Sequence, residues 1–359
     1  MVGPFEGRGQ RASIYGIAIL VVIIIAFSAS FGEAPTVRLE TIQQVWRARQ
    51  EQVHTARLSW KEQITQPCGS ISAHMPRIVR HRLQLTGKEI IPPEDKTLDF
   101  SLTLELDDGK ARFSYEGMEW AGDNADHYRS IKYASVFDGT ECKDLYPDGL
   151  GNVSRPQGGI RAETRFRDAQ LYRLRPLLLA YRSLDPSLRP FDLQGFSACA
   201  ERKNIGGRLC IELEKRVPPL DAFLRLWVDP ERDFVVLRHT IEENGEVRVK
   251  MDIDYRQDVS AGWVPTHWAI VSNGPDGRII DSTRGSMITT EFNGKTDATL
   301  FALVFPTGTM VVDEKNGGST IYMSAVGRKP LWKFLPLLFG AFALALLIWR
   351  RWPLLKREK

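Results

Sequence analysis

The sequence lacks the short motifs that identify common catalytic and cofactor sites. It contains no His-Glu-x-x-His metal motif, no Gly-x-Ser-x-Gly nucleophile elbow and no Gly-x-x-x-x-Gly-Lys-Ser/Thr phosphate loop. The histidines are scattered along the chain, at His54, His74, His81, His127, His239 and His267. We therefore predict a protein that is not an enzyme and that holds neither a metal nor another cofactor. A hydrolase with an unfamiliar site remains an alternative.

The sequence also has little charge imbalance, and it has no long apolar run away from its two ends. The formal net charge is +4 and 26% of the 359 residues are charged, which argues against a disordered chain and against a nucleic-acid binder. A mean hydropathy of −0.24 argues against several membrane spans. The length allows one large domain or two small ones.

The N-terminus has the layout of a secretory signal. Arg8 and Arg11 precede an apolar run over residues 14–27, and small residues follow at 28–30. A helix over this run would be about 21 Å long, which is short of a bilayer core of about 30 Å. Residues 1–31 are therefore predicted to be a signal peptide or an N-terminal membrane anchor, and either one exports the chain that follows.

A second apolar run, over residues 331–352, is predicted to be a transmembrane helix. Tryptophans lie near both of its ends, where they anchor membrane helices at the interface: Trp332, Trp349 and Trp352. The positive-inside rule places the basic tail 353–359 in the cytoplasm. Residues 32–330 then form an extracytoplasmic domain on the periplasmic side of the inner (cytoplasmic) membrane. A buried core helix is the alternative for the apolar run.

The exported region has four cysteines and no Cys-x-x-Cys spacing. An even number of cysteines in an oxidising compartment favours disulfides. Cys199 and Cys210 flank a hairpin turn predicted at 204–207, so we predict a bridge between them, with Cys68 and Cys142 as the remaining pair. Free buried thiols are the alternative, and metal ligation is poorly supported because no histidines cluster with the cysteines.

Hydrophobic periodicity predicts a few helices among many strands. Helical spacing is present over 37–53 and again over 169–184, where Pro176 lies inside the pattern. Two-residue alternation predicts a hairpin over 100–115, and 191–312 is almost wholly strand-like, with turn residues between its strands. The fold class is therefore α+β, with one large, curved antiparallel sheet and a few helices packed on one face.

Two short stretches resemble the lipoprotein carrier superfamily, the LolA/LolB/RseB-like fold of periplasmic carriers and sensors. They are Leu226-Trp-Val-Asp-Pro-Glu-Arg-Asp-Phe234, where a strand ends in an Asp-Pro turn, and Gly262-Trp-Val-Pro-Thr266, which opens a later strand. The resemblance covers about residues 37–312. It implies a strongly bent antiparallel sheet, or half-barrel, with helices on the concave face. The predicted C-terminal span differs from soluble carriers and argues against a shuttling role.

Aromatic side chains on the predicted strands are the candidates for ligand binding: Phe223, Trp227, Phe234, Trp263 and Trp268. In the resembled fold the concave face forms an apolar cavity for acyl chains, whereas ordinary core packing is the alternative. We predict a membrane-tethered module that binds a hydrophobic ligand such as a lipid, an acylated peptide or a lipoprotein. The alternative is an envelope scaffold or sensor that binds a protein partner through the sheet. No nucleic-acid partner is expected.

Overall fold

The computed structural model divides the chain into two compact units, Met1–Arg38 and Leu39–Lys359. The residues that it describes are 37–70, 92–120, 128–149, 155–161, 166, 168–182, 184, 193–218, 221–314 and 320–323. The predicted signal segment 1–31, the predicted span 331–352 and the basic tail 353–359 lie outside these ranges. Within them, no helix is both long enough and apolar enough to cross a membrane.

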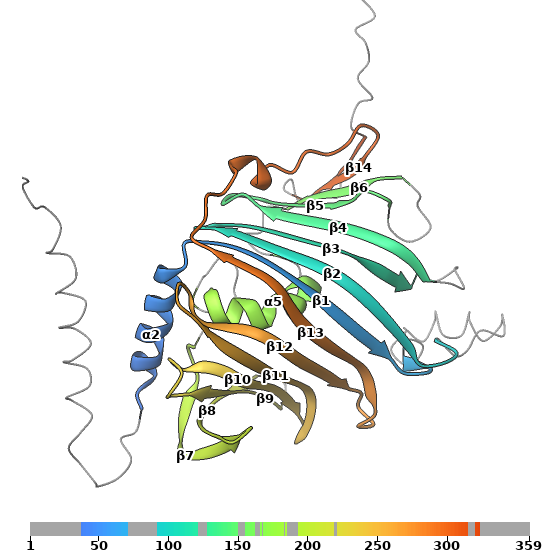
Figure 1. The fold of residues 1–359 in the computed structure, drawn as a ribbon. Coiled ribbons are helices and arrows are strands. Elements are labelled where there is room, and N and C mark those ends of the chain that lie inside the picture. Colours follow the sequence, from blue (N-terminus) through green and yellow to red (C-terminus); the bar gives the residue numbers. More distant parts are fainter. Residues whose placement is uncertain are drawn as a thin grey trace, which may run out of the picture. The chain divides into compact units, whose positions relative to one another are not determined.

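The second unit combines α-helices with one large β-sheet (Figure 1). The helices are α2 (Leu39–Gln52) and α5 (Asp168–Tyr181), and η1 (Ala298–Phe301) is a 3₁₀ turn. The strands of the first half are β1 (Thr55–Gln66), β2 (Lys96–Asp107), β3 (Lys110–Trp120), β4 (Tyr128–Phe137), β5 (Cys142–Tyr146) and β6 (Gln157–Arg161). The later strands are β7 (Ser197–Ile205), β8 (Arg208–Val217), β9 (Ala222–Asp229), β10 (Val235–Glu243), β11 (Glu246–Asp258), β12 (Gly262–Asn273), β13 (Ile279–Phe292), β14 (Met310–Asp313) and β15 (Thr320–Met323).

The described strands form a single 15-stranded sheet in the order β15-β14-β6-β5-β4-β3-β2-β1-β13-β12-β11-β10-β9-β8-β7. Neighbouring strands are antiparallel except β14 and β6, which are parallel. Strand β1 lies in the middle and pairs with β2 on one side and with β13 on the other. The predicted antiparallel α+β fold is therefore confirmed for the described part of the chain.

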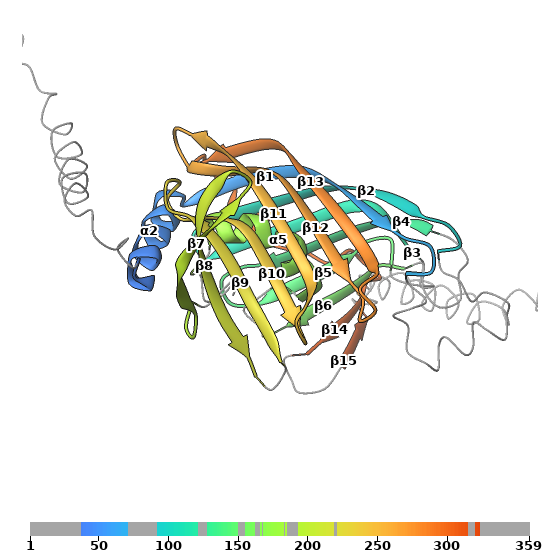
Figure 2. The ribbon, with the colours of Figure 1, turned by 90° about the horizontal axis from the view of Figure 1, so that it is seen from below.

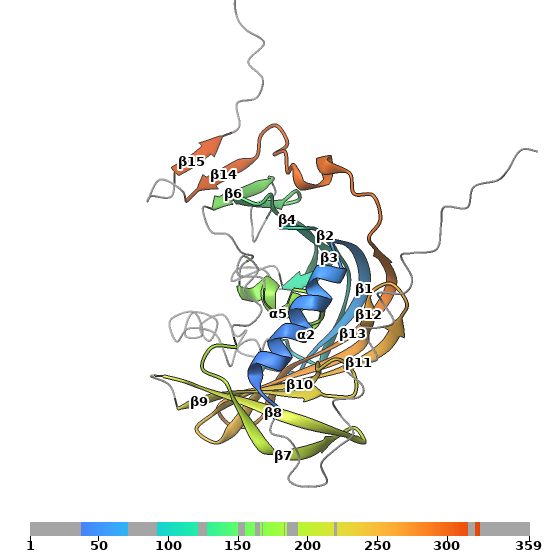
Figure 3. The ribbon, with the colours of Figure 1, turned by 90° about the vertical axis from the view of Figure 1, so that its left-hand side faces the viewer.

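The sheet has an apolar face, which we call the inner face, because strand residues alternate between two sides. On β1 the buried positions are Leu58, Trp60 and Glu62, and their partners on β2 are Leu104, Leu102 and Phe100, all of them buried. Helix α5 packs on this inner face and buries Leu174, Leu177 and Leu178. Figure 2 and Figure 3 show the sheet curving around α5.

Both predicted helices are present, with slightly different ends. Helix α2 begins two residues after the predicted start and ends one residue before the predicted end. It is tied to the turn before β10, where Trp46 Nε1 donates to the carbonyl oxygen of Phe234 at 2.8 Å. Helix α5 contains Pro176, as expected, and ends at Tyr181.

The opposite face, which we call the outer face, is partly covered by the segment that follows β13. Phe301 and Leu303 pack against Val136 and Leu145, which belong to β4 and β5. Arg112 Nη1 donates to the carbonyl oxygen of Leu300 at 2.8 Å. The sequence predicted 191–312 to be almost wholly strand-like, but residues 302–309 form no strand. The apolar residues of this segment pack onto the outer face, and only Met310–Asp313 joins the sheet as β14.

The predicted disulfides are absent, although all four cysteines lie in the described part of the chain. The register of β7 and β8 places Cys210 opposite Lys203, and it shifts between Ala198 and Arg202, so Cys199 does not face Cys210. Cys142 is buried on the inner face, whereas Cys68 is exposed and its Sγ donates to the carbonyl oxygen of Pro93 at 3.2 Å. None of the four forms a disulfide, as in the alternative of free buried thiols, but only Cys142 and Cys210 are buried.

Some strand glycines make room for an aromatic ring on the neighbouring strand or segment. A Cβ atom on Gly285 would overlap the indole of Trp268, and one on Gly117 would overlap the ring of Phe100. These glycines are needed for close packing across the strands.

Replacing Gly285 with alanine tests this packing. We expect Gly285→Ala to lower the free energy of unfolding by about 1–3 kcal/mol, because the new methyl group forces the Trp268 indole out of its place. Chemical denaturation followed by tryptophan fluorescence measures the change. Gly294→Ala is the matched control, since nothing lies within 4 Å of a Cβ atom there. Equal stability of the two variants would contradict the packing argument.

Candidate functional site

The inner face carries a buried carboxylate at Glu62. The alternation of β1 turns this side chain inward with Trp60, and the residue is 1% exposed. Trp60 Nε1 donates to Glu62 Oε1 at 3.0 Å. Burial raises the pKa of Glu62, and the Arg173 guanidinium and the indoles of Trp60 and Trp268 oppose that rise only in part. Among the described residues, the Glu62 carboxylate therefore has few partners that stabilise its negative charge.

Arg173 on α5 is the charged neighbour of Glu62. Its Nε lies 4.0 Å from Glu62 Oε2, at the outer limit of an ion pair. The guanidinium carbon lies 4.2 Å from the ring centre of Phe100 and 4.9 Å from that of Tyr115. These are cation–π distances, so the two rings hold the guanidinium in place.

An aromatic band runs along the inner face beside this pair. We define it as Trp60, Phe100, Phe113, Tyr115, Tyr133 and Tyr146. Ring centres are 6.1 Å apart for Trp60 and Phe113 and 5.8 Å apart for Phe113 and Tyr115. The spacing is 5.0 Å between Tyr115 and Tyr133 and 4.7 Å between Tyr133 and Tyr146. Tyr115 and Tyr146 are half-buried, whereas the other rings of the band are buried.

A second buried carboxylate, Asp144 on β5, has many more partners than Glu62. Tyr133 Oη donates to Asp144 Oδ1 at 2.6 Å and Ser135 Oγ donates to the same oxygen at 2.7 Å. Arg161 Nε donates to Asp144 Oδ2 at 3.1 Å. Such a satisfied network fixes β4, β5 and β6 to one another. We assign Asp144 a structural role for this reason.

The aromatic residues singled out in the sequence lie in several places. Trp227 and Trp263 pack in one apolar cluster with Cys210, Val235 and Leu237. Trp268 lies on the inner face, edge-on to Trp60 at 6.2 Å. Phe234 lies in the turn that contacts α2, and Phe223 lies near the start of β9. The structure thus brings Trp227 and Trp263 together, and only Trp268 lies next to the Glu62 carboxylate.

Glu62, Arg173 and Tyr115 were not predicted from the sequence. A signal for Glu62 was available, because it occupies the apolar phase of the β1 pattern that includes Leu58 and Trp60. Arg173 is one of the arginines between Arg155 and Arg189, for which the sequence favours a solvated helix face and loop, with contact to anionic lipid head groups as the alternative. In the structure its side chain is 21% exposed.

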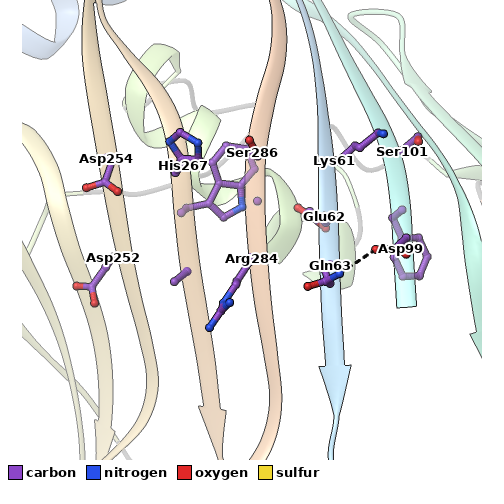
Figure 4. Close-up of a pocket in the computed structure, with 14 residues that line it drawn as sticks. Lys61, Glu62, Gln63, Asp99, Ser101, Asp252, Asp254, His267, Arg284 and Ser286 are labelled. Atoms are coloured by element: carbon purple, nitrogen blue, oxygen red, sulfur yellow. Dashed lines mark hydrogen bonds between the residues drawn. The ribbon is translucent and has the colours of Figure 1, made fainter. Parts of the chain in front are cut away.

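The outer face contains a hollow of about 730 Å³ over the middle of the sheet (Figure 4). The side chains that line it come from β11, β12, β13, β1 and β2, on the side opposite α5, and most are polar: Lys61, Gln63, Asp99, Ser101, Asp252, Asp254, His267, Arg284 and Ser286. The small side chain of Ala269 also lines it. Charges of both signs around a polar floor suit a polar partner more than an acyl chain. Within the described ranges, no three His, Cys, Asp or Glu residues are placed to hold a metal ion.

Comparisons with known proteins give structural likenesses only. No family model matches the chain, and no curated protein matches its sequence. A DUF1329 family protein from Desulfovibrio piger is 9% identical, with a TM-score of 0.36, over 73% of this chain and 96% of that one. A LolA superfamily protein from Nitrosomonas europaea is 10% identical, with a TM-score of 0.35, over 72% of this chain and 96% of that one. A β-barrel-like protein from Brucella abortus, a domain of unknown function, is 7% identical, with a TM-score of 0.27, over 67% of this chain and 99% of that one.

One of these neighbours thus belongs to the superfamily that the sequence resembles. At these identities and TM-scores the likenesses identify neither a ligand nor a partner.

The raised pKa of Glu62 predicts how stability depends on pH. In the unfolded chain this carboxyl ionises near its ordinary value of 4.5, whereas in the folded protein it keeps its proton to higher pH. Between the pKa of Glu62 in the unfolded chain and its higher pKa in the folded protein, the folded state therefore binds more protons than the unfolded state. The contribution of Glu62 to stability falls as pH rises through this range. Glu62→Gln cannot ionise at this position, so the variant does not lose this stability. Its free energy of unfolding should exceed that of the unaltered protein by about 1.4 kcal/mol for each unit by which the pKa of Glu62 is raised.

Denaturation of both proteins between pH 4.5 and pH 8 measures the difference, which we expect to grow with pH in favour of Glu62→Gln and then level off. Glu116→Gln, at an exposed position of β3, controls for the loss of one carboxylate. A difference that stays constant over this range would contradict the prediction.

Proposed function

We propose that this chain is a membrane-tethered, non-enzymatic module that binds a hydrophobic ligand, such as a lipid or an acylated peptide, on the inner face of its sheet. The observation that carries the proposal is the aromatic band. The band is continuous across β1 to β5 and lies on the inner face, and two of its rings, Tyr115 and Tyr146, are half-buried. Ligand sites are concave and mostly apolar, and burying apolar surface supplies about 25 cal/mol per Å².

The tether and the location are proposed from the sequence. The apolar run 331–352 and its basic tail favour an inner-membrane anchor, and the N-terminal segment 1–31 favours export of the domain between them. A LolA superfamily protein among the structural neighbours is compatible with a carrier-like or receptor-like module. A module anchored in this way would receive a ligand at the membrane surface.

Binding of an uncharged apolar dye tests the proposed function. We expect the purified full-length protein to enhance Nile red fluorescence and to carry lipid that mass spectrometry detects after extraction. Tyr115→Ser should weaken dye binding several-fold, because it removes an aromatic surface from the band. Ile288→Ser is the matched control, since Ile288 is 56% exposed on β13 and outside the band. No lipid and no dye binding by the unaltered protein would refute the proposal.

The outer hollow favours a second candidate function, an envelope scaffold or sensor that binds a protein partner through the sheet. Lys61 and Arg284 form no ion pair with any described residue, and Asp254 lies across the hollow from them (Figure 4). Unpaired charges of both signs on an exposed sheet are available to a complementary protein surface.

Site-specific photo-crosslinking in intact cells tests this second function. A crosslinker at Ser286, within the hollow, should trap one defined partner, and Arg284→Glu should reduce its yield at least several-fold through charge repulsion. A crosslinker at Val259, in the exposed turn between β11 and β12, is the control for nonspecific capture. Equal patterns from the two positions would count against a partner at the hollow.

A further inference from the structure

The Arg173 guanidinium is partly buried, and its hydrogen bonding is incomplete among the described residues. A guanidinium has five N–H donors, and a buried donor without a partner is costly. Arg173 Nη1 is buried and has no hydrogen-bond partner among the described residues. Its Nε reaches Glu62 Oε2 only at 4.0 Å, and that oxygen is itself buried without a hydrogen bond from any described residue.

Glu62, the acidic neighbour of Arg173, is also poorly stabilised in its ionised form. Burial disfavours the ionised form of Glu62, and Trp60 supplies its hydrogen bond within the described structure. Asp144 shows what a complete site looks like in the same protein, with a bonded arginine and two hydroxyl donors. Among the described residues Arg173 has no comparable partner, and we infer from this that its charge is available to an added anion.

The surroundings of Arg173 suit an anion that carries an apolar chain. Phe100 and Tyr115 contact the guanidinium, and both rings belong to the aromatic band. A planar guanidinium held in this way presents its N–H edge in a fixed direction, which is the geometry that carboxylates and phosphates match. The cation and the apolar surface are therefore adjacent.

We propose that Arg173 binds the carboxylate or phosphate head group of an amphipathic ligand whose apolar chain lies along the aromatic band. This inference rests on the proposed hydrophobic-ligand function and adds the charge of the ligand to it. The head group would accept hydrogen bonds from Nη1 and from the outward edge of the guanidinium. Glu62 competes for the same cation, so it limits the affinity for the anion.

Displacement of Nile red by dodecanoate and by dodecanol tests the inference, since the two compounds share an apolar chain and differ in charge. With the full-length protein, dodecanoate should displace the dye at about tenfold lower concentration than dodecanol, as expected for a difference of about 1.4 kcal/mol. Arg173→Gln should remove this preference and leave dodecanol unchanged. Arg278→Gln, which removes an exposed cation from the turn between β12 and β13, should keep this preference.

A second variant keeps the test valid if Arg173→Gln folds poorly. Glu62→Gln removes the competing carboxylate and should increase the preference for dodecanoate. Thermal unfolding of each variant establishes that it is folded under the binding conditions. A preference that neither Arg173→Gln nor Glu62→Gln alters would overturn the inference, while dye binding would still support the hydrophobic-ligand function.

Inorganic phosphate distinguishes a head group from a free anion. Millimolar phosphate should displace no dye and should reduce the preference for dodecanoate only slightly, because it lacks the apolar chain. If phosphate alone binds to Arg173 as tightly as dodecanoate does, the site recognises free anions and the head-group assignment is wrong. If neither dodecanoate nor dodecanol displaces the dye, the inference and the proposed function fail together.

Discussion

The pairing of β1 with β13 is the interaction on which the rest of this structure depends. It joins the first and the last long strands and brings the two halves of the sheet together. Asn293 secures the end of this pair, because its side chain accepts from the His54 amide at 3.0 Å and donates to the Gln52 carbonyl at 2.9 Å. The inner face, with α5 upon it, exists only when this pair has formed.

Two buried acids on that inner face differ in what surrounds them. Asp144 is bonded by Tyr133, Ser135 and Arg161, so it holds three strands together. Glu62, by contrast, has one indole hydrogen bond and a distant arginine among the described residues. A network whose hydrogen bonds are all satisfied is suited to a structural role, whereas one with unsatisfied donors and acceptors can still take up a ligand. We therefore place the binding function at Glu62 and Arg173.

The sequence predicted the local features of this fold because local patterns determine them. The alternation in 100–115 predicted the hairpin that forms β2 and β3, and helical spacing predicted α2 and α5. The neighbours of β1 could not be predicted, because periodicity gives the faces of a strand and not its partners. The disulfide prediction was wrong for a similar reason, since an irregular register between Ala198 and Arg202 changes which residue faces Cys210.

The candidate site was predicted only in part. The sequence predicted that aromatic residues on strands form the site, and one of the predicted residues, Trp268, lies beside Trp60 of the aromatic band. The pair of Glu62 and Arg173 was missed because it joins a strand and a helix that are far apart in sequence, and charge alone does not reveal burial. Whether an arginine lies on a solvated face or between two rings depends on tertiary packing, as the contacts of Arg173 with Phe100 and Tyr115 illustrate.

The central position of β1 also has a kinetic consequence. Its partner β13 is synthesised much later, as the sequence separation of 239 between His54 and Asn293 indicates. Chains dominated by such long-range pairing fold slowly, because loop-closure entropy must be overcome before the contacts form. During synthesis the edge of β1 that pairs with β13 therefore stays unpaired until nearly all of the described chain has emerged, and the apolar side chains of β1 and β2 stay exposed beside it. A nascent chain of this kind is exposed to aggregation, and a chaperone that covers the first hairpins would have its greatest effect in that interval.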